Sequence, residues 1–219
     1  MLSIQKKETA NAPKLWVLPD NFSEISKMFS KEKTEWIKKY LFDNEKDIAV
    51  LSTLEQPLEI FIRPEKDAKD FPKQEENCRI LAAKSLSHFD GAGCQSVEIA
   101  GNVSKRLLLA TAEGLALSAY RFVKYFSDPE TKKCKVQNIA IVSSEITAVE
   151  IAEQNALCAA VMQARDWVNE PACFLTATKF AEEMAAMATK SGATADILSK
   201  KKIEALKMGG LLSVNQGSE

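Results

Sequence analysis

Short runs of β-forming residues alternate with helical patterns through most of this 219-residue chain. The runs typical of strands are residues 2–7, 14–19, 47–53, 58–64, 96–101 and 137–144. Helical spacing of apolar residues separates them at 31–42, 73–89 and 104–126, the last interrupted by Gly114. Because strands that alternate with helices pack as a sheet between helical layers, the pattern predicts an α/β fold.

The clearest helical pattern covers residues 147–169. Thr147 and Glu150 have the spacing of a capping box at its start, and Asn169 and Pro171 end it. Mostly small side chains share one face, and their size would allow close packing: Val149, Ala152, Ala156, Ala159 and Gln163.

A second cycle of elements follows this helix. The sequence predicts a helix over 176–192, a strand over 195–199, a short helix over 200–209 and an apolar strand over 210–214. If the chain ends at Glu219, the last strand lacks the neighbours of a sheet, and such an exposed edge is an aggregation liability. In that case we expect residues 172–219 to be poorly ordered or packed in a makeshift way.

The charge of the chain is close to balanced, because 29 Lys and Arg stand against 30 Asp and Glu, giving −1. A nucleic-acid-binding domain usually has a basic excess, so we expect no nucleic-acid partner. The N-terminus has no apolar signal region, and no apolar run reaches the ~20 residues of a membrane span. The five cysteines are widely spaced without a CxxC pair, which favours reduced thiols in a cytoplasm over disulfides or a zinc site.

Few side chains are candidates for catalysis. His88 is the only histidine and has no nucleophile motif beside it, so we interpret it as a surface or capping residue at a helix end. Cys78 and Cys158 fall in helical patterns as small apolar residues. Cys173 has no visible basic partner to activate it.

The charged clusters also have simple interpretations. Adjacent carboxylates at 75–76 and 182–183 would point to different sides of a helix, so a solvated face explains them better than metal binding. The lysine clusters at 132–135 and 200–202 are most simply solvated turns or helix starts. An anion site at the helix start near Lys200 stays open.

Arg165 and Asp166, near the end of the 147–169 helix, favour an interdomain hinge over an active-site wall. Neither the GxGxxG nor the GxxxxGK[ST] phosphate loop occurs. No catalytic or metal-binding residue can therefore be assigned in this chain, and its substrate-binding residues stay unknown.

Three segments resemble the leucyl (cytosol) aminopeptidase family. They are EGL at 113–115 with YRF at 120–122 and Tyr125, ARD at 164–166 with VNEP at 168–171 and LT at 175–176, and KMGGLL at 207–212 with QGS at 216–218. The departures concern the hinge and the turn before QGS: Trp167 stands where an aliphatic residue is usual, Cys173 and Phe174 replace a more polar pair, Ala177 replaces a common proline and Asn215 a frequent glycine.

The resemblance implies an architecture and a set of partners. It implies a macro-domain-like N-terminal domain over 1–146, with a mixed sheet flanked by helices, then a linking helix and hinge over 147–171. Residues 172–219 would be an incomplete start of a second α/β domain, the catalytic one. The family also implies a cytoplasmic hexamer that removes N-terminal residues from peptides.

The chemistry implied by the resemblance needs two divalent metal ions, Zn or Mn, whose bound water attacks the scissile carbonyl. The metal-binding lysine, aspartates and glutamate of the family follow the QGS segment, so none can be carried onto this chain. We therefore expect the full-length parent to be the enzyme and the 219-residue chain to be inactive alone, without bound metal.

Two alternatives remain open. One is a stand-alone macro-like module that binds a nucleotide or ADP-ribose, against which stands the shortness of the only glycine signal, Gly91-Ala92-Gly93. The other is an assembly module that positions subunits.

Overall fold

The computed structural model describes residues 3–5, 12–53, 56–65 and 70–217. The chain divides at Ala164 into two compact units, Met1–Ala164 and Arg165–Glu219. This division falls inside the helix Ala148–Asn169. The family resemblance implies that residues 147–171 are a linking helix and hinge. Among the described residues, no helix combines the length and the apolar character that a membrane span needs.

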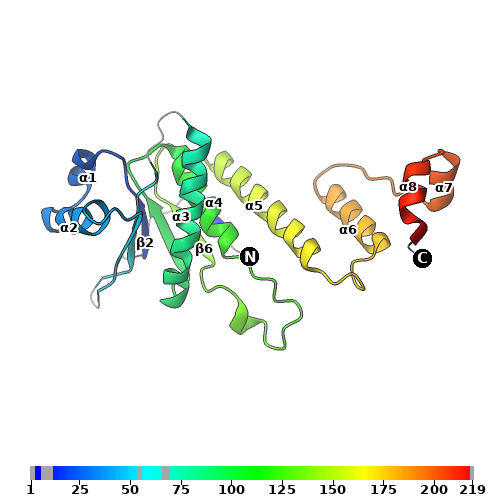
Figure 1. Cartoon of the computed structure of the whole chain (residues 1–219), viewed down its shortest axis with the longest axis horizontal. Helices are drawn as coiled ribbons and strands as arrows, with labels where there is room; N and C mark the ends of the chain where they lie inside the picture. The colour runs from blue at the N-terminus through cyan, green and yellow to red at the C-terminus, as the bar shows by residue number, and fades with distance from the viewer. Residues whose placement is uncertain (1–2, 6–11, 54–55, 66–69, 218–219) are drawn as a thin grey trace. The chain divides into compact units, whose positions relative to one another are not determined.

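A six-stranded mixed sheet forms the centre of the first unit (Figure 1). The strands are β1 (Ser3–Gln5), β2 (Lys14–Val17), β3 (Ile48–Leu51), β4 (Glu59–Ile62), β5 (Ser96–Ala100) and β6 (Asn138–Ile141), in the order β1-β6-β5-β2-β4-β3. All pairs are parallel except the antiparallel pair of β3 and β4. The α/β class and the existence of the six predicted strands are confirmed, and residues 2, 6 and 7 of the strand predicted over 2–7 lie outside the described residues.

Helices α3 (Phe71–Gly91) and α4 (Lys105–Ser118) cover one face of this sheet (Figure 1). Alternate residues such as Leu15 and Val17 of β2 point into the core that these helices share with the sheet. Gly114 does not interrupt α4. A Cβ built on Gly114 would lie 2.4 Å from the carbonyl oxygen of Arg79, so this glycine allows the backbones of α3 and α4 to approach closely.

The predicted helix 104–126 is wrong beyond Ser118, because α4 ends there and residues 119–126 are not helical. The guanidinium of Arg121 caps this end of the helix. Its Nη1 donates to the carbonyl oxygens of Ser118 and Tyr120, each at 2.8 Å, and so satisfies carbonyls that a continuing helix would use. A long segment with the short 3₁₀ helix η2 (Glu130–Lys132) then leads to β6.

Helices α1 (Phe22–Met28) and α2 (Lys31–Ile37) pack on the opposite face of the sheet (Figure 1). A π-helical turn, η1 (Lys38–Phe42), continues α2 and confirms the helical pattern predicted over 31–42. Aromatic rings fill this second core, where Phe29 lies edge-on to Trp16 at 4.9 Å and to Phe61 at 5.7 Å.

Helix α5 (Ala148–Asn169) begins with the predicted capping box. Glu150 N donates to Thr147 Oγ1 at 3.2 Å, and Thr147 N donates to Glu150 Oε2 at 2.9 Å. The face of mostly small side chains is exposed, and Val149, one of its members, is 66% exposed. On another face of the helix, Ile151 and Cys158 are buried. The side-chain amide of Asn155 accepts a hydrogen bond from the N–H of Ile4 in edge strand β1 and donates one to the C=O of Ile4.

The second unit contains α6 (Ala177–Lys190), α7 (Lys200–Ala205), α8 (Gly209–Val214) and the 3₁₀ turn η3 (Asn215–Gly217). The predicted strands at 195–199 and 210–214 are wrong, because the first is irregular and the second lies in α8. A strand needs a neighbour for its backbone N–H and C=O groups, and residues 165–217 include no strand, whereas a helix bonds these groups within itself.

No residue between 165 and 217 is buried, so the described part of the second unit has no core of its own. The prediction that this segment is poorly ordered or packed in a makeshift way stays a prediction, and the lack of buried side chains is its structural basis.

Candidate functional site

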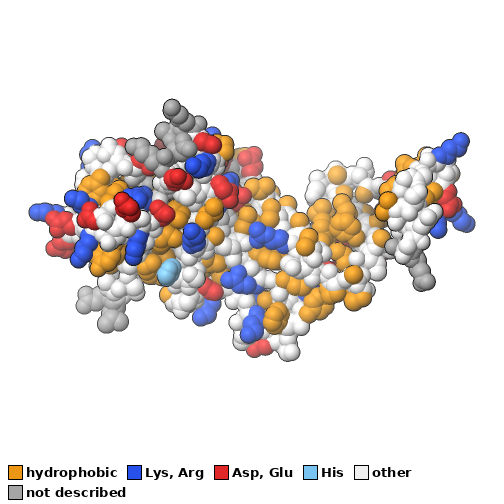
Figure 2. Space-filling model, viewed as in Figure 1, with side chains coloured by type: hydrophobic (Ala, Val, Ile, Leu, Met, Phe, Trp, Pro, Cys, Tyr) orange, Lys and Arg blue, Asp and Glu red, His pale blue; other side chains and the backbone are white. Residues whose placement is uncertain are grey.

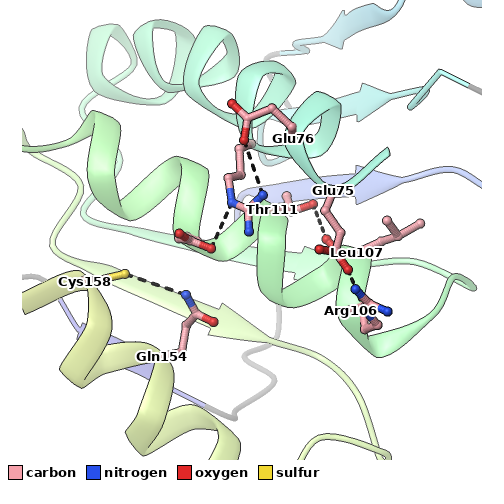
Figure 3. Close-up of polar contacts among 9 residues, drawn as sticks. Glu75, Glu76, Arg106, Leu107, Thr111, Gln154 and Cys158 are labelled. Atoms are coloured by element: carbon pink, nitrogen blue, oxygen red, sulfur yellow. Dashed lines mark hydrogen bonds and ion pairs between the residues drawn. The ribbon is translucent and has the colours of Figure 1, made fainter. Parts of the chain in front are cut away.

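Two arginine–glutamate bridges cross between α3 and α4 (Figure 3). Arg79 Nε lies 2.9 Å from Glu113 Oε2, and Arg106 Nε lies 2.5 Å from Glu75 Oε1. Partial burial would lower the pKa of Arg79, but the hydrogen bond and charge of Glu113 outweigh it and raise that pKa. These two ion pairs join α3 to α4.

The adjacent carboxylates at 75–76 do point to different partners, as expected. Glu76 Oε2 accepts from Arg79 Nη1 at 3.3 Å and its side chain is exposed. The solvated interpretation is wrong for Glu75, because only 15% of its side chain is exposed and it faces Arg106 (Figure 3).

A second charged cluster lies on the sheet face opposite α3 and α4. Glu59 accepts from Trp16 Nε1 at 2.9 Å and from Lys33 Nζ at 2.6 Å. Lys14 Nζ lies 3.6 Å from Glu98 Oε2, and Glu98 is fully buried. The sequence analysis did not identify this cluster; alternation along β2, which places Lys14 and Trp16 on one face, was the available signal.

All five cysteines are free, and the buried ones are poor nucleophiles. Burial raises the pKa of Cys78 to about 11, and it also raises the pKa values of Cys94 and Cys134. The interpretation of Cys78 and Cys158 as small apolar residues is confirmed by their burial. Gln154 Nε2 lies 3.9 Å from the sulfur of Cys158 (Figure 3), and Cys173 is exposed.

The remaining candidates have local partners. His88 is exposed in the last turn of α3, as expected. Glu183 Oε2 accepts from Trp167 Nε1 at 2.7 Å, and Lys202 Nζ lies 2.9 Å from Asp196. Within the described ranges, no three His, Cys, Asp or Glu side chains are grouped so that they could hold a metal ion.

The segment that follows α5 is a tight turn. Glu170 N donates to the carbonyl of Asp166 at 3.0 Å, and Leu175 N donates to that of Pro171 at 2.9 Å. The ring of Trp167 lies edge-on to Phe180 at 5.1 Å. Trp167, a departure from the family pattern, therefore joins the end of α5 to α6 within the second unit.

A cavity of about 250 Å³ lies at the carboxyl ends of β2 and β4, where α/β sheets commonly bind ligands. Its wall contains the carboxylates of Asp20, Asp47 and Glu65 and the guanidinium of Arg63. The guanidinium lies 4.8 Å from the centre of the Phe42 ring. Carboxylates outnumber cations in this wall, so the cavity is unfavourable for a diphosphate.

A family comparison matches a part of the chain that contains two of the three motif segments, 164–176 and 207–218. Residues 162–219 match the family described as "Cytosol aminopeptidase family, catalytic domain". A probable cytosol aminopeptidase of Clostridium perfringens is 34% identical over 186 residues, which cover 81% of this chain and 35% of the relative. One from Rhodococcus jostii is 33% identical over 149 residues, covering 63% of this chain and 30% of the relative.

Solved structures share the fold. A mutant of tomato leucine aminopeptidase superposes with a TM-score of 0.74 at 15% identity, covering 100% of this chain and 48% of that one. Leucyl aminopeptidase from Trypanosoma cruzi gives 0.65 at 14% identity, covering 93% and 44%. The chain spans about a third of the length of the two curated relatives named above.

Proposed function

Because this chain belongs to the leucyl (cytosol) aminopeptidase family, we propose that it is the N-terminal portion of a metallo-aminopeptidase that removes N-terminal residues from peptides. The first unit would be the macro-like N-terminal domain, and residues 172–219 would begin the catalytic domain. A cytoplasmic location and a hexamer are parts of this proposal that rest on the family resemblance alone.

The apolar surface of the second unit carries the proposal. Large apolar side chains of residues 165–217 are exposed, and Figure 2 shows hydrophobic side chains gathered over α6. Val168 is 84% exposed and Val214 is 87% exposed. Exposed apolar surface of this kind is typical of sites that contact another protein segment, a membrane or a ligand. We assign that contact to the remainder of a catalytic domain, because the family match falls on the same residues.

The two divalent metal ions that the family implies do not fit the residues described here. No group of three potential ligands occurs among them, and the resemblance puts the ligands after the QGS segment at 216–218. We therefore derive no catalytic step for this chain, and its inactivity when alone is part of the proposal.

The macro-like nucleotide-binding module is the second candidate. Its support is the α/β sheet with a cavity at its carboxyl edge, and the acidic wall of that cavity opposes it. Calorimetric titration with ADP-ribose separates this module from the aminopeptidase portion, because saturable binding would favour the module.

The assembly module is tested by native mass spectrometry of the chain, in which a defined oligomer would identify it.

The transcript offers a direct test of the parent enzyme. We expect the reading frame to continue past the codon of Glu219 into a glycine-rich segment that carries lysine and aspartate residues. A stop codon directly after Glu219 in the gene would contradict the proposal.

A further inference from the structure

A cavity of about 300 Å³ lies in the first unit where the end of α4, the segment after η2 and one side chain of α5 meet. This volume lies at the lower end of the range of small-molecule pockets. The segment that forms much of the wall is visible at the bottom of the first unit in Figure 2, where Lys and Arg side chains lie next to hydrophobic ones.

One part of the wall is apolar. Val136 is 1% exposed, Ala119 and Cys134 are both 8% exposed, and Met162 of α5 completes this part. Burial raises the pKa of the Cys134 thiol, so at neutral pH it adds an uncharged surface. This side of the cavity suits an aliphatic group.

The other part of the wall is charged and contains both signs. Arg121 lines the cavity, and two hydrogen bonds to the carbonyls of Ser118 and Tyr120 fix its position. Nη1 donates both of these bonds, and the guanidinium has further N–H donors on Nε and Nη2. Glu130 and Lys133 also line the cavity and form an ion pair with each other.

The Glu130–Lys133 pair can exchange partners at little cost. The two side chains are 75% and 49% exposed, and ion pairs at such positions contribute little to stability. The opposite charges of Glu130 and Lys133 are in contact, so they match a ligand whose own opposite charges are close together. An α-amino acid carries its ammonium and carboxylate on one carbon atom.

We propose that this cavity binds a free α-amino acid with an apolar side chain. The carboxylate lies on Arg121 and Lys133, the ammonium on Glu130, and the side chain against Val136 and Met162. Such a site goes beyond the peptidase proposed above and does not depend on it, because every group that forms it lies in the first unit.

Isothermal titration calorimetry of the 219-residue chain with L-leucine tests this site. We expect saturable binding at one site per chain. Leucinamide lacks the carboxylate and isocaproate lacks the ammonium, so each should bind about tenfold more weakly or worse. Leucyl-leucine, whose charges are far apart, should be weakened similarly. No heat at millimolar leucine, or equal binding of any of the three analogues, would overturn the assignment.

Variants of exposed residues locate the binding. Lys133→Gln and Glu130→Gln should each weaken leucine binding about tenfold, because each removes one charge-assisted hydrogen bond. Lys132→Gln changes a neighbouring lysine that does not line the cavity and should leave the affinity unchanged. Binding that survives both lining changes, or that Lys132→Gln weakens equally, would place leucine elsewhere and refute the proposal.

Discussion

Gly114 sits where α4 meets the backbone of α3, and an added Cβ would lie within 2.4–2.8 Å of three Arg79 backbone atoms. These atoms cannot rotate away as a flexible side chain would. We expect Gly114→Ala to force the helices apart and to lower the free energy of unfolding by about 1–3 kcal/mol, as overpacked cores do. Urea denaturation followed by circular dichroism measures this change.

Gly91 supplies the matched control for that substitution. It lies in the last turn of α3, and a Cβ built there meets no atom within 4 Å. Gly91→Ala should leave the free energy of unfolding within about 0.5 kcal/mol. Equal effects at the two glycines would show that the close approach of the helix backbones is unimportant.

Glu150 makes the stability of the first unit decrease as the pH becomes acidic. Its hydrogen bond from Lys105 and then its bonds from Thr147 lower the pKa of Glu150 from 4.5 to about 2. The unfolded chain therefore takes up a proton at this carboxyl more readily than the folded chain. The stability that Glu150 contributes is fully present above about pH 4.5 and is lost as the pH falls towards 2.

The substitution Glu150→Gln removes this dependence. We expect the stability difference between wild type and Glu150→Gln to be constant above pH 4.5 and to shrink as the pH falls from 4.5 to 2, in urea titrations at a series of pH values. Glu153→Gln, an exposed change on the same helix, is the control. A difference that stays constant down to pH 2 would contradict the role of the Lys105 and Thr147 bonds.

At the residue scale, the sequence could predict only contacts between residues that are close together in the chain. The capping box of Thr147 and Glu150 was predictable, because both partners lie within one helical turn. The bond between Trp167 and Glu183 and that between Arg79 and Glu113 were not, because each depends on how two helices pack. An indole N–H that is partly buried usually finds a partner, but the sequence alone does not say which.

At the scale of single elements, Asn155 connects α5 to the edge strand β1. Its side chain bonds both backbone polar groups of Ile4, each at 2.9 Å. Asn155→Ala removes both bonds, so we expect a loss of about 1–3 kcal/mol of stability and faster amide exchange at Ile4. Gln163→Ala, at an exposed position of α5, should do neither. Unchanged exchange at Ile4 in the Asn155 variant would refute this attachment.

Element ends and the elements of the second unit were harder to predict than those of the first. The pattern over 104–126 stays helical in appearance, although α4 ends at Ser118, where Arg121 caps a carbonyl. The apolar run at 210–214 could be a strand or a helix, since short apolar runs are ambiguous. The lack of a strand neighbour within 165–217 decides for the helix.

At the scale of the whole molecule, the two units differ in how their side chains are buried. The first has two apolar cores, one on each face of its sheet, whereas residues 165–217 contain no buried side chain. We therefore expect brief trypsin digestion to cut first within 172–217, at sites such as Lys190 and Lys207. Fragments whose second unit stays intact while exposed lysines of the first unit, such as Lys31, are cut would contradict this expectation.

The α/β class was predictable, because alternating strands and helices are visible in the sequence. The strand order was not, because the placement of β5 and β4 on either side of β2 depends on crossover connections that no local pattern encodes. Likewise, the motifs identified the family, but the cavities arise from residues distant in sequence. Met162, for example, lines a cavity with Ala119 and Val136.

We propose that this chain is the N-terminal part of a two-metal aminopeptidase and that it lacks the residues that hold the metals. The measurement that tests it most directly is leucine release from a leucyl anilide by the purified 219-residue chain with Mn²⁺ or Zn²⁺, beside an active leucine aminopeptidase as positive control. We predict no release above background. Release that a chelator abolishes would place a working metal centre within these residues and contradict the claim.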